Sequence, residues 1–127
     1  MNLMPLADLL EGAGVGVKGS SLFVNQMPPA AERAVMLRSP LAGSKINYEL
    51  PGFYQTEFQV IARSHSFDDG DALIREAMDA LLIEFETDID TMRVNYCRPA
   101  TEPVTYPLSL GNLLEFSVRF DICFVKV

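Results

Sequence analysis

The sequence has few of the side chains that catalysis, metal binding and disulfide scaffolds require. Its 127 residues include one histidine and two cysteines. Two cysteines are too few for a disulfide framework, so we expect free thiols in a reducing cytoplasm. No run of about 18 apolar residues occurs, the length that a membrane-spanning helix needs. The first residues carry no cationic stretch ahead of their apolar ones, so we expect no secretory signal.

Basic residues are also scarce. Lys and Arg number 10 against 17 Asp and Glu, which gives a formal net charge of −7. Binding to nucleic-acid phosphates or to anionic lipid requires clustered Lys and Arg, so the charge disfavours both. Hydrophobic residues, by contrast, make up 49% of the chain. That share supports one hydrophobic core, and we expect a single domain over residues 1–127 rather than a disordered chain.

Helical periodicity predicts two helices of unequal length. A short helix is expected over about residues 3–11, with Gly12 ending it. A longer helix is expected to begin near Ser66 or Asp68, where acidic side chains suit the positive end of the helix dipole. Its apolar stripe is predicted to run through to Glu86, with Ile83 out of place in the polar stripe. The stripe consists of Ile74, Ala77, Met78, Leu81, Leu82 and Phe85.

Alternation of apolar and polar residues predicts the strands. The two clearest are residues 54–63 and residues 114–124, and the second is long enough to be central in a sheet. Three more strands are expected at residues 21–25, 34–38 and 92–97. The predicted fold class is therefore α+β, a mostly antiparallel twisted sheet flanked by one long and one short helix.

Two long connections, residues 39–53 and 99–112, are expected to project as loops. Prolines at positions 99, 103 and 107 are predicted to prevent regular strand pairing across residues 99–108. Exposed apolar side chains in such loops suit a subunit interface, the alternative being that each packs on its own core. The candidate interface residues are Leu41, Ile46, Tyr48, Leu50, Phe53, Ile83, Tyr106 and Leu108.

Two motifs that resemble catalytic or cofactor sites lack the context that such sites need. The run from Gly14 to Gly19 matches G-x-G-x-x-G, but the predicted helix precedes it and a strand follows, the reverse of a dinucleotide site. We interpret this run as a flexible linker that packs little. His65 lies between two serines at a strand-to-helix turn, and an exposed turn residue is favoured over a general base.

The remaining candidate ligands do not form a metal site. Asp69 and Asp71 fit two positions of a calcium loop, but Leu73 occupies the third. Cys97 and Cys123 have no C-x-x-C spacing and no second histidine beside them. We therefore predict no catalytic, cofactor-binding or metal-binding residues, no cofactor and no enzymatic activity.

The order of motifs resembles the small tail terminator proteins of long-tailed bacteriophages, often labelled minor capsid proteins. The resemblance extends over about residues 3–125, from the short helix and Gly-rich joint to the closing strand. Its most specific part is the strand FQVIARS at residues 58–64, followed by a helix carrying Ala72, Ala77 and Leu81-Leu82. SLFVNQMP at residues 21–28 and the loop end LPGF at residues 50–53 also agree.

The resemblance implies a structural role in a siphovirus-like virion. Such proteins are α+β domains that form a homohexameric ring on the completed tail tube, stop its polymerisation and present a surface to the head-completion or neck proteins. The implied partners are other copies of the chain, the major tail tube protein and a neck protein. DNA passes through the ring without specific binding, which the negative charge suits. No membrane is implied; the implied location is the head-proximal end of the virion tail, and the host cytoplasm during assembly.

Two alternatives remain open at the level of sequence. The first stays within virion structure and makes the chain a head-completion or neck protein, or a tail tube subunit. The second is of another class, a small cytoplasmic ligand-binding domain or enzyme that uses His65, Asp68 and Asp69.

Overall fold

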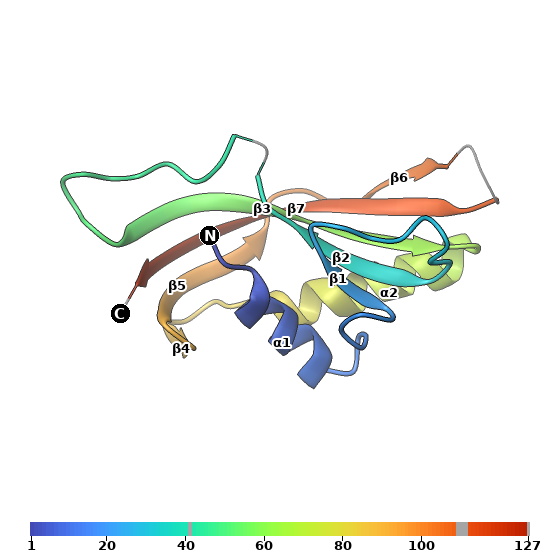
Figure 1. Ribbon diagram of the computed structural model, residues 1–127, viewed down its shortest axis with the longest axis horizontal. Helices are drawn as coiled ribbons and strands as arrows, with labels where there is room; N and C mark the ends of the chain where they lie inside the picture. Colours follow the sequence, from blue (N-terminus) through green and yellow to red (C-terminus); the bar gives the residue numbers. More distant parts are fainter. Residues whose placement is uncertain (41, 109–111, 127) are drawn as a thin grey trace.

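The computed structural model describes residues 1–40, 42–108 and 112–126. The sequence patterns produce two helices and a curved mixed sheet, which confirms the predicted α+β class (Figure 1). Neither helix in these ranges has the length and apolar character that a bilayer crossing requires. The elements in chain order are α1 (Met4–Gly12), β1 (Leu22–Val24), β2 (Ala34–Arg38), β3 (Phe53–Ser64), α2 (Phe67–Leu81), β4 (Thr87–Ile89), β5 (Met92–Pro99), β6 (Val104–Pro107) and β7 (Leu114–Lys126).

The sheet is built around the two longest strands. Its order is β1-β2-β3-β7-β5-β4, and β6 also pairs with β7. β3 pairs antiparallel with β7 along its full length, from Phe53↔Val125 to Ser64↔Leu114. The expected central position of the last strand is therefore confirmed. β1 and β2 are parallel, and every other strand pair among the described residues is antiparallel.

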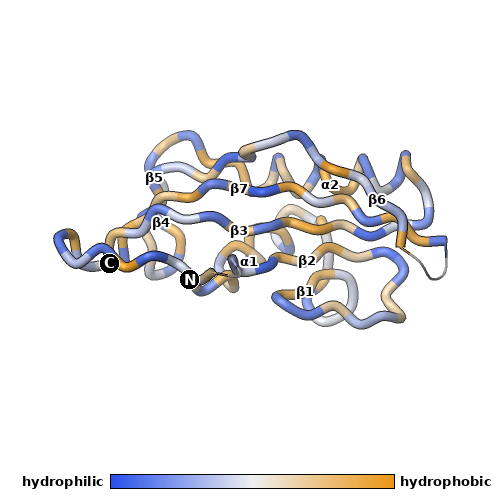
Figure 2. Tube along the Cα trace, turned by 90° about the horizontal axis from the view of Figure 1, so that it is seen from above, coloured by the Kyte–Doolittle hydropathy of each residue, from blue (hydrophilic) through white to orange (hydrophobic). Residues whose placement is uncertain are grey.

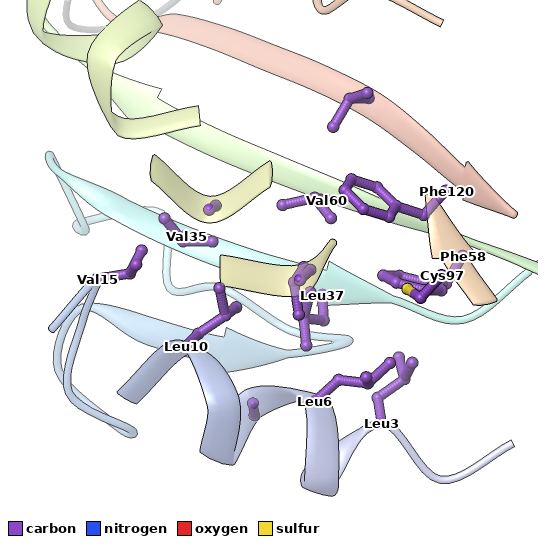
Figure 3. Close-up of a cluster of buried hydrophobic side chains, with 14 of the residues drawn as sticks. Leu3, Leu6, Leu10, Val15, Val35, Leu37, Phe58, Val60, Cys97 and Phe120 are labelled. Atoms are coloured by element: carbon purple, nitrogen blue, oxygen red, sulfur yellow. The ribbon is translucent and has the colours of Figure 1, made fainter. Parts of the chain in front are cut away.

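The period-two alternation of these strands places one face of the sheet against both helices. Phe58 lies opposite Phe120 in the register, and their stacked rings are 5.4 Å apart. Leu3, Leu6 and Leu10 point from α1 and its first turn toward the strands (Figure 3). Blue and orange segments alternate along the tubes of β3 and β7, as expected for strands with one buried face (Figure 2). This buried face and the helices form the core.

α2 begins as the sequence predicts but ends earlier. Ser66 is the N-cap, and its hydroxyl accepts a hydrogen bond from the Asp69 backbone N–H at 3.4 Å. The helix ends at Leu81 and Leu82 is already extended, so the predicted continuation to Glu86 is wrong. The extended chain then forms a β-bridge from Ile83 to Cys97. Strand pairing from Ile83 onward satisfies backbone groups that further helical turns would have satisfied.

The predicted absence of pairing across residues 99–108 is also wrong. β6 pairs with β7, with Val104 opposite Ser117 and Tyr106 opposite Glu115. Prolines occupy the position before β6 and its last residue, so the residues between them keep their backbone N–H groups. Edge strands tolerate proline in such places, because one side of the strand pairs with nothing.

The glycine run after α1 is more ordered than a linker. Val15 is buried, and the backbone N–H groups of residues 19–22 are hydrogen bonded within a tight turn. A Cβ on Gly16 would lie 2.9 Å from the Ser21 carbonyl oxygen, so the turn closes only with glycine there. The expectation that this run packs little is therefore wrong, although the reversed order of helix and strand stands.

The connection from β2 to β3 lies on the side of the sheet that faces away from both helices (Figure 1). We call residues 42–52 the arm. It contains no helix or strand. The chain exposes 7262 Å² of surface, compared with roughly 6,700 Å² expected for a folded chain of this mass. A projecting arm accounts for a surface larger than that of a smooth globule.

Candidate assembly surfaces

The residues that could have formed a catalytic site are engaged elsewhere. The Asp69 carboxylate accepts hydrogen bonds from Arg33 at 2.9 Å and from the Ser64 hydroxyl at 2.7 Å. These bonds, the one from Arg33 first, lower the pKa of Asp69. His65 is exposed and its Nε2 lies 3.3 Å from a Glu32 carboxylate oxygen. These contacts join the turn between β3 and α2 to the connection between β1 and β2. They leave Asp69 unavailable as a partner for His65.

The two cysteines lie on opposite faces of the sheet. In the β5–β7 register Cys97 lies opposite Ile122, whereas Cys123 lies opposite Tyr96. Cys97 belongs to the core against the helices, and its burial raises the pKa of its thiol to about 12. Across residues 1–40, 42–108 and 112–126, no three His, Cys, Asp or Glu side chains gather as metal ligands.

The arm carries most of the exposed apolar side chains that the sequence singled out. Ile46, Tyr48 and Leu50 are exposed, and Tyr48 retains 87% of its surface. Phe53 is half-buried at the first position of β3. Leu41 lies outside the described residues. The arm therefore presents an apolar row to its surroundings, on the side of the sheet away from the helices.

A polar cavity separates the arm from the sheet beneath it. The cavity has a volume of about 760 Å³, and Lys45 of the arm lines it together with Gln55, Glu57, Tyr96 and Arg119. Arg119 and Glu57 form an ion pair of 3.3 Å, and Gln55 donates a hydrogen bond to the Tyr96 hydroxyl. Because the surface below it is polar, the arm does not pack against the sheet as a hydrophobic lid would.

The other candidate residues are divided between surface and core. Tyr106 is exposed on β6, and partial burial together with the neighbouring Glu115 carboxylate raises its pKa. Leu108 is half-buried just after β6. Ile83 is 9% exposed and belongs to the core, so its side chain offers no free surface. The early end of α2 explains this, because Ile83 follows the phase of a strand rather than that of the helix.

The early end of α2 also leaves exposed two residues that the helical stripe had placed in the core. Leu82 is 42% exposed and Phe85 is 81% exposed, so their predicted burial is wrong. No local pattern reveals this exposure, because an alternation of period two starting at Ile83 would also have placed Phe85 on the buried face. The sequence alone does not reveal the surface to which these residues belong.

That surface is a shallow groove of about 580 Å³ on the helix side of the sheet. We call it the acidic groove. Its lining comes from the end of α2, the segment after it, β4 and α1. The apolar lining residues include Leu9, Leu82, Phe85 and Ile89, and the acidic ones are Asp79, Glu84 and Asp88.

The formal charge is distributed unevenly along the chain. Residues 67–91, which form α2, β4 and the segment between them, contain nine acidic residues and one arginine, a net charge of −8. The rest of the chain contains eight acidic and nine basic residues, a net charge of +1. Nearly all of the negative charge thus lies in the segment that forms most of the acidic groove.

Comparison with known proteins agrees with this architecture. The family model described as "Bacteriophage tail terminator protein" matches residues 9–125. A solved chain from "Virion of native gene transfer agent (GTA) particle" has a TM-score of 0.63 at 14% identity, covering 95% of this chain and 84% of that chain. At that identity the likeness shows a shared fold. No curated protein matches significantly. Because the family model spans most of the sequence, the chain belongs to the bacteriophage tail terminator family and is a structural protein of the phage virion.

Proposed function

We propose that this protein caps the completed tail tube. Copies of the chain form a homohexameric ring, one face of which docks on the last ring of tail tube subunits and denies the next ring its site. The opposite face offers the surface to which the head-completion or neck protein joins. The protein acts at the head-proximal end of the tail, after assembly in the host cytoplasm.

The observation that carries this proposal is the pair of unlike apolar surfaces on one chain. The arm exposes Tyr48 on one side of the sheet, and the acidic groove exposes Phe85 on the other. Large apolar side chains exposed in this way favour burial against another protein. Two different patches per chain produce head-to-tail contacts, and such contacts close into rings when the rotation between copies allows it.

The charge distribution supports the passage of DNA through such a ring. With a net charge of −7 per chain, a ring of identical copies carries a strongly negative field. Phosphate groups in the lumen are repelled by that field, so DNA passes without adhering to the protein. Four arginines form ion pairs with acidic side chains of the same chain, so they are already partnered and not free for phosphate groups: Arg33, Arg63, Arg75 and Arg119.

Growth of tail tubes in vitro tests the proposal. Purified tail tube subunits are polymerised with and without this protein, and tube lengths are measured by negative-stain electron microscopy. We expect added protein to stop growth and to appear as density at one end of each tube. An unchanged length distribution would contradict capping. Filaments formed by this protein alone at high concentration would instead indicate a tube subunit.

A matched variant provides the control. Glu102→Ala changes an exposed side chain that lines neither the arm nor the acidic groove. This variant should cap as the parent does. Particles that lack the protein altogether should contain headless tails of uncontrolled length.

A further inference from the structure

We propose that the arm of one copy seats in the acidic groove of the next copy, and that this contact, repeated around the ring, holds the ring together. The inference rests on the proposed ring, and it names the two surfaces that meet. The occupant of the groove is therefore a second copy of the same chain.

The groove has the composition of a receptor for an apolar segment. Leu82 and Phe85 are both exposed on the short stretch between α2 and β4, and Leu9 of α1 adds to the apolar lining. Acidic side chains of Asp79 and Glu84 line the same groove. An occupant that suits this surface carries apolar side chains and a positive charge.

The arm matches that description. Ile46, Tyr48 and Leu50 are exposed at alternating positions, and Lys45 immediately precedes them. Glu49 lies between Tyr48 and Leu50, so the arm is neutral overall and its positive charge is confined to its first half. An extended chain spans at most about 3.5 Å per residue, so an arm that leaves the sheet and returns to it over residues 42–52 projects by less than about 20 Å. That reach limits the arm to contacts with a chain that lies close to its own.

Charge favours contact between the arm and the acidic groove. Like-charged chains repel one another, and a contact that brings free positive charge to free negative charge offsets part of that repulsion. Across the described residues Lys45 forms no ion pair within 4.0 Å, and the same is true of Asp79 and Glu84. Asp88, the third acid of the groove, is already paired with Arg93 at 3.0 Å.

The two surfaces cannot satisfy each other within one chain. The arm lies on the side of the sheet away from the helices, whereas β4 and α1, which line the groove, lie on the helix side (Figure 1). Each copy thus places its arm in the groove of one neighbour and receives the arm of its other neighbour in its own groove. This is a heterologous contact, the type that a ring requires.

Disulfide cross-linking tests the contact directly. In the double variant Tyr48→Cys and Phe85→Cys, oxidation in the presence of tail tubes should link copies into a ladder that extends beyond dimers on a non-reducing gel. The native Cys97 and Cys123 are buried and therefore compete little for cross-linking. The control, Tyr48→Cys with Glu102→Cys, keeps the arm thiol and moves the second thiol to another exposed site. Dimers alone in the first variant, or an equal ladder in the control, would overturn the proposal.

Charge exchange provides an independent readout. Lys45→Glu and Glu84→Lys should each weaken ring formation, by about three- to tenfold in apparent affinity, and the combined variant should recover most of the loss. Arg98→Glu makes the same change in net charge outside the arm, and Glu84→Lys should not compensate for it. Ring formation is measured by mass photometry, or by electron microscopy of capped tubes.

The failure of this inference is distinguishable from failure of the proposed function. Rings that cap tubes normally but give no arm-to-groove cross-link would overturn the contact and leave the capping role intact. Loss of both rings and length control in the parent protein would overturn the capping role as well.

Discussion

At the scale of single residues, Gly70 sets the distance between α2 and the sheet. A Cβ at this position would lie 2.0 Å from Cε1 of the buried Phe116 ring. Real carbon atoms do not approach so closely, so a side chain at position 70 must displace either the ring or the helix. The missing carbon atom therefore allows the helix to pack directly on Phe116.

We expect Gly70→Ala to destabilise the fold by about 2 kcal/mol, because overpacking of the core outweighs the usual gain in helix propensity. Urea denaturation measures the change. Ala72→Gly, at an exposed position of the same helix, should cost about 1 kcal/mol through propensity alone. Adding Phe116→Leu to Gly70→Ala should recover part of the stability. A Gly70→Ala protein as stable as the parent would contradict this packing.

Asp69 gives a residue-scale dependence on pH. Its pKa in the folded protein lies below the ordinary value because of hydrogen bonds from Arg33 and Ser64. A carboxyl group with a lowered folded pKa stabilises the protein above its unfolded pKa, about 3.9, and this contribution is lost as the pH falls through the folded pKa. The contribution is modest because the side chain is partly exposed.

Asp69→Asn should therefore lower the melting temperature at about pH 7, and the difference from the parent should shrink as the pH approaches about 2. Thermal melts followed by circular dichroism across this range measure it. Asp68→Asn removes a charge from the same helical turn without the two hydrogen bonds. It should show a smaller difference at neutral pH. A constant difference for Asp69→Asn at every pH would show that the charge is not its cause.

At the scale of elements, the end of α2 decides which side chains remain free for assembly. Because α2 ends at Leu81, Ile83 lies in the core, whereas Leu82 and Phe85 remain at the surface. Continuation of the helix to Glu86, less than two further turns, would have reversed this assignment. The backbone bridge between Ile83 and Cys97 fixes the strand-like phase, because both of their N–H groups donate to the other's carbonyl oxygen.

We expect Ile83→Ala to cost about 2–4 kcal/mol in the free energy of unfolding, because it removes a buried side chain and leaves a cavity. Phe85→Ala should change the stability by less than about 0.5 kcal/mol, because its side chain is exposed. Chemical denaturation of both variants measures the difference. Tube-length assays should show the opposite order, with Phe85→Ala impaired in capping. A larger loss of stability for Phe85→Ala would contradict the observed end of the helix.

At the scale of the whole molecule, stability and assembly depend on different parts of the chain. The core lies between the helices and one face of the sheet, whereas the arm lies beyond the other face (Figure 1). A long surface connection contributes little to stability, because the entropy of closing a loop varies slowly with its length. The arm can therefore be altered without unfolding the protein.

Replacing residues 44–50 with a glycine and serine segment of the same length should leave the unfolding free energy within about 1 kcal/mol of the parent, yet abolish capping. Urea denaturation and the tube-length assay measure the two properties. The arm's return to β3 is retained in this variant, because Gly52 and its hydrogen bond from the Lys126 N–H are unchanged. Normal capping by the altered protein would show that the arm has no role in assembly.

The sequence by itself determined the features that depend on local periodicity. Alternation over residues 54–63 and 114–124 predicted β3 and β7, and Ser66 with its acidic neighbours predicted the start of α2. The exposed apolar residues of the arm, Ile46, Tyr48 and Leu50, were also recognisable from the local sequence. Each of these signals lies within a few residues, so no distant contact was needed to read it.

Only the tertiary structure decided the features that depend on partners far along the chain. β6 forms between prolines because it pairs with β7. The chain leaves the helix after Leu81 because Ile83 forms backbone hydrogen bonds with Cys97 in both directions. The arm and the acidic groove lie on opposite sides of the sheet for the same reason. Local sequence sets the phase of each segment, but long-range hydrogen bonding and packing decide which phase continues and which surface is left for another chain.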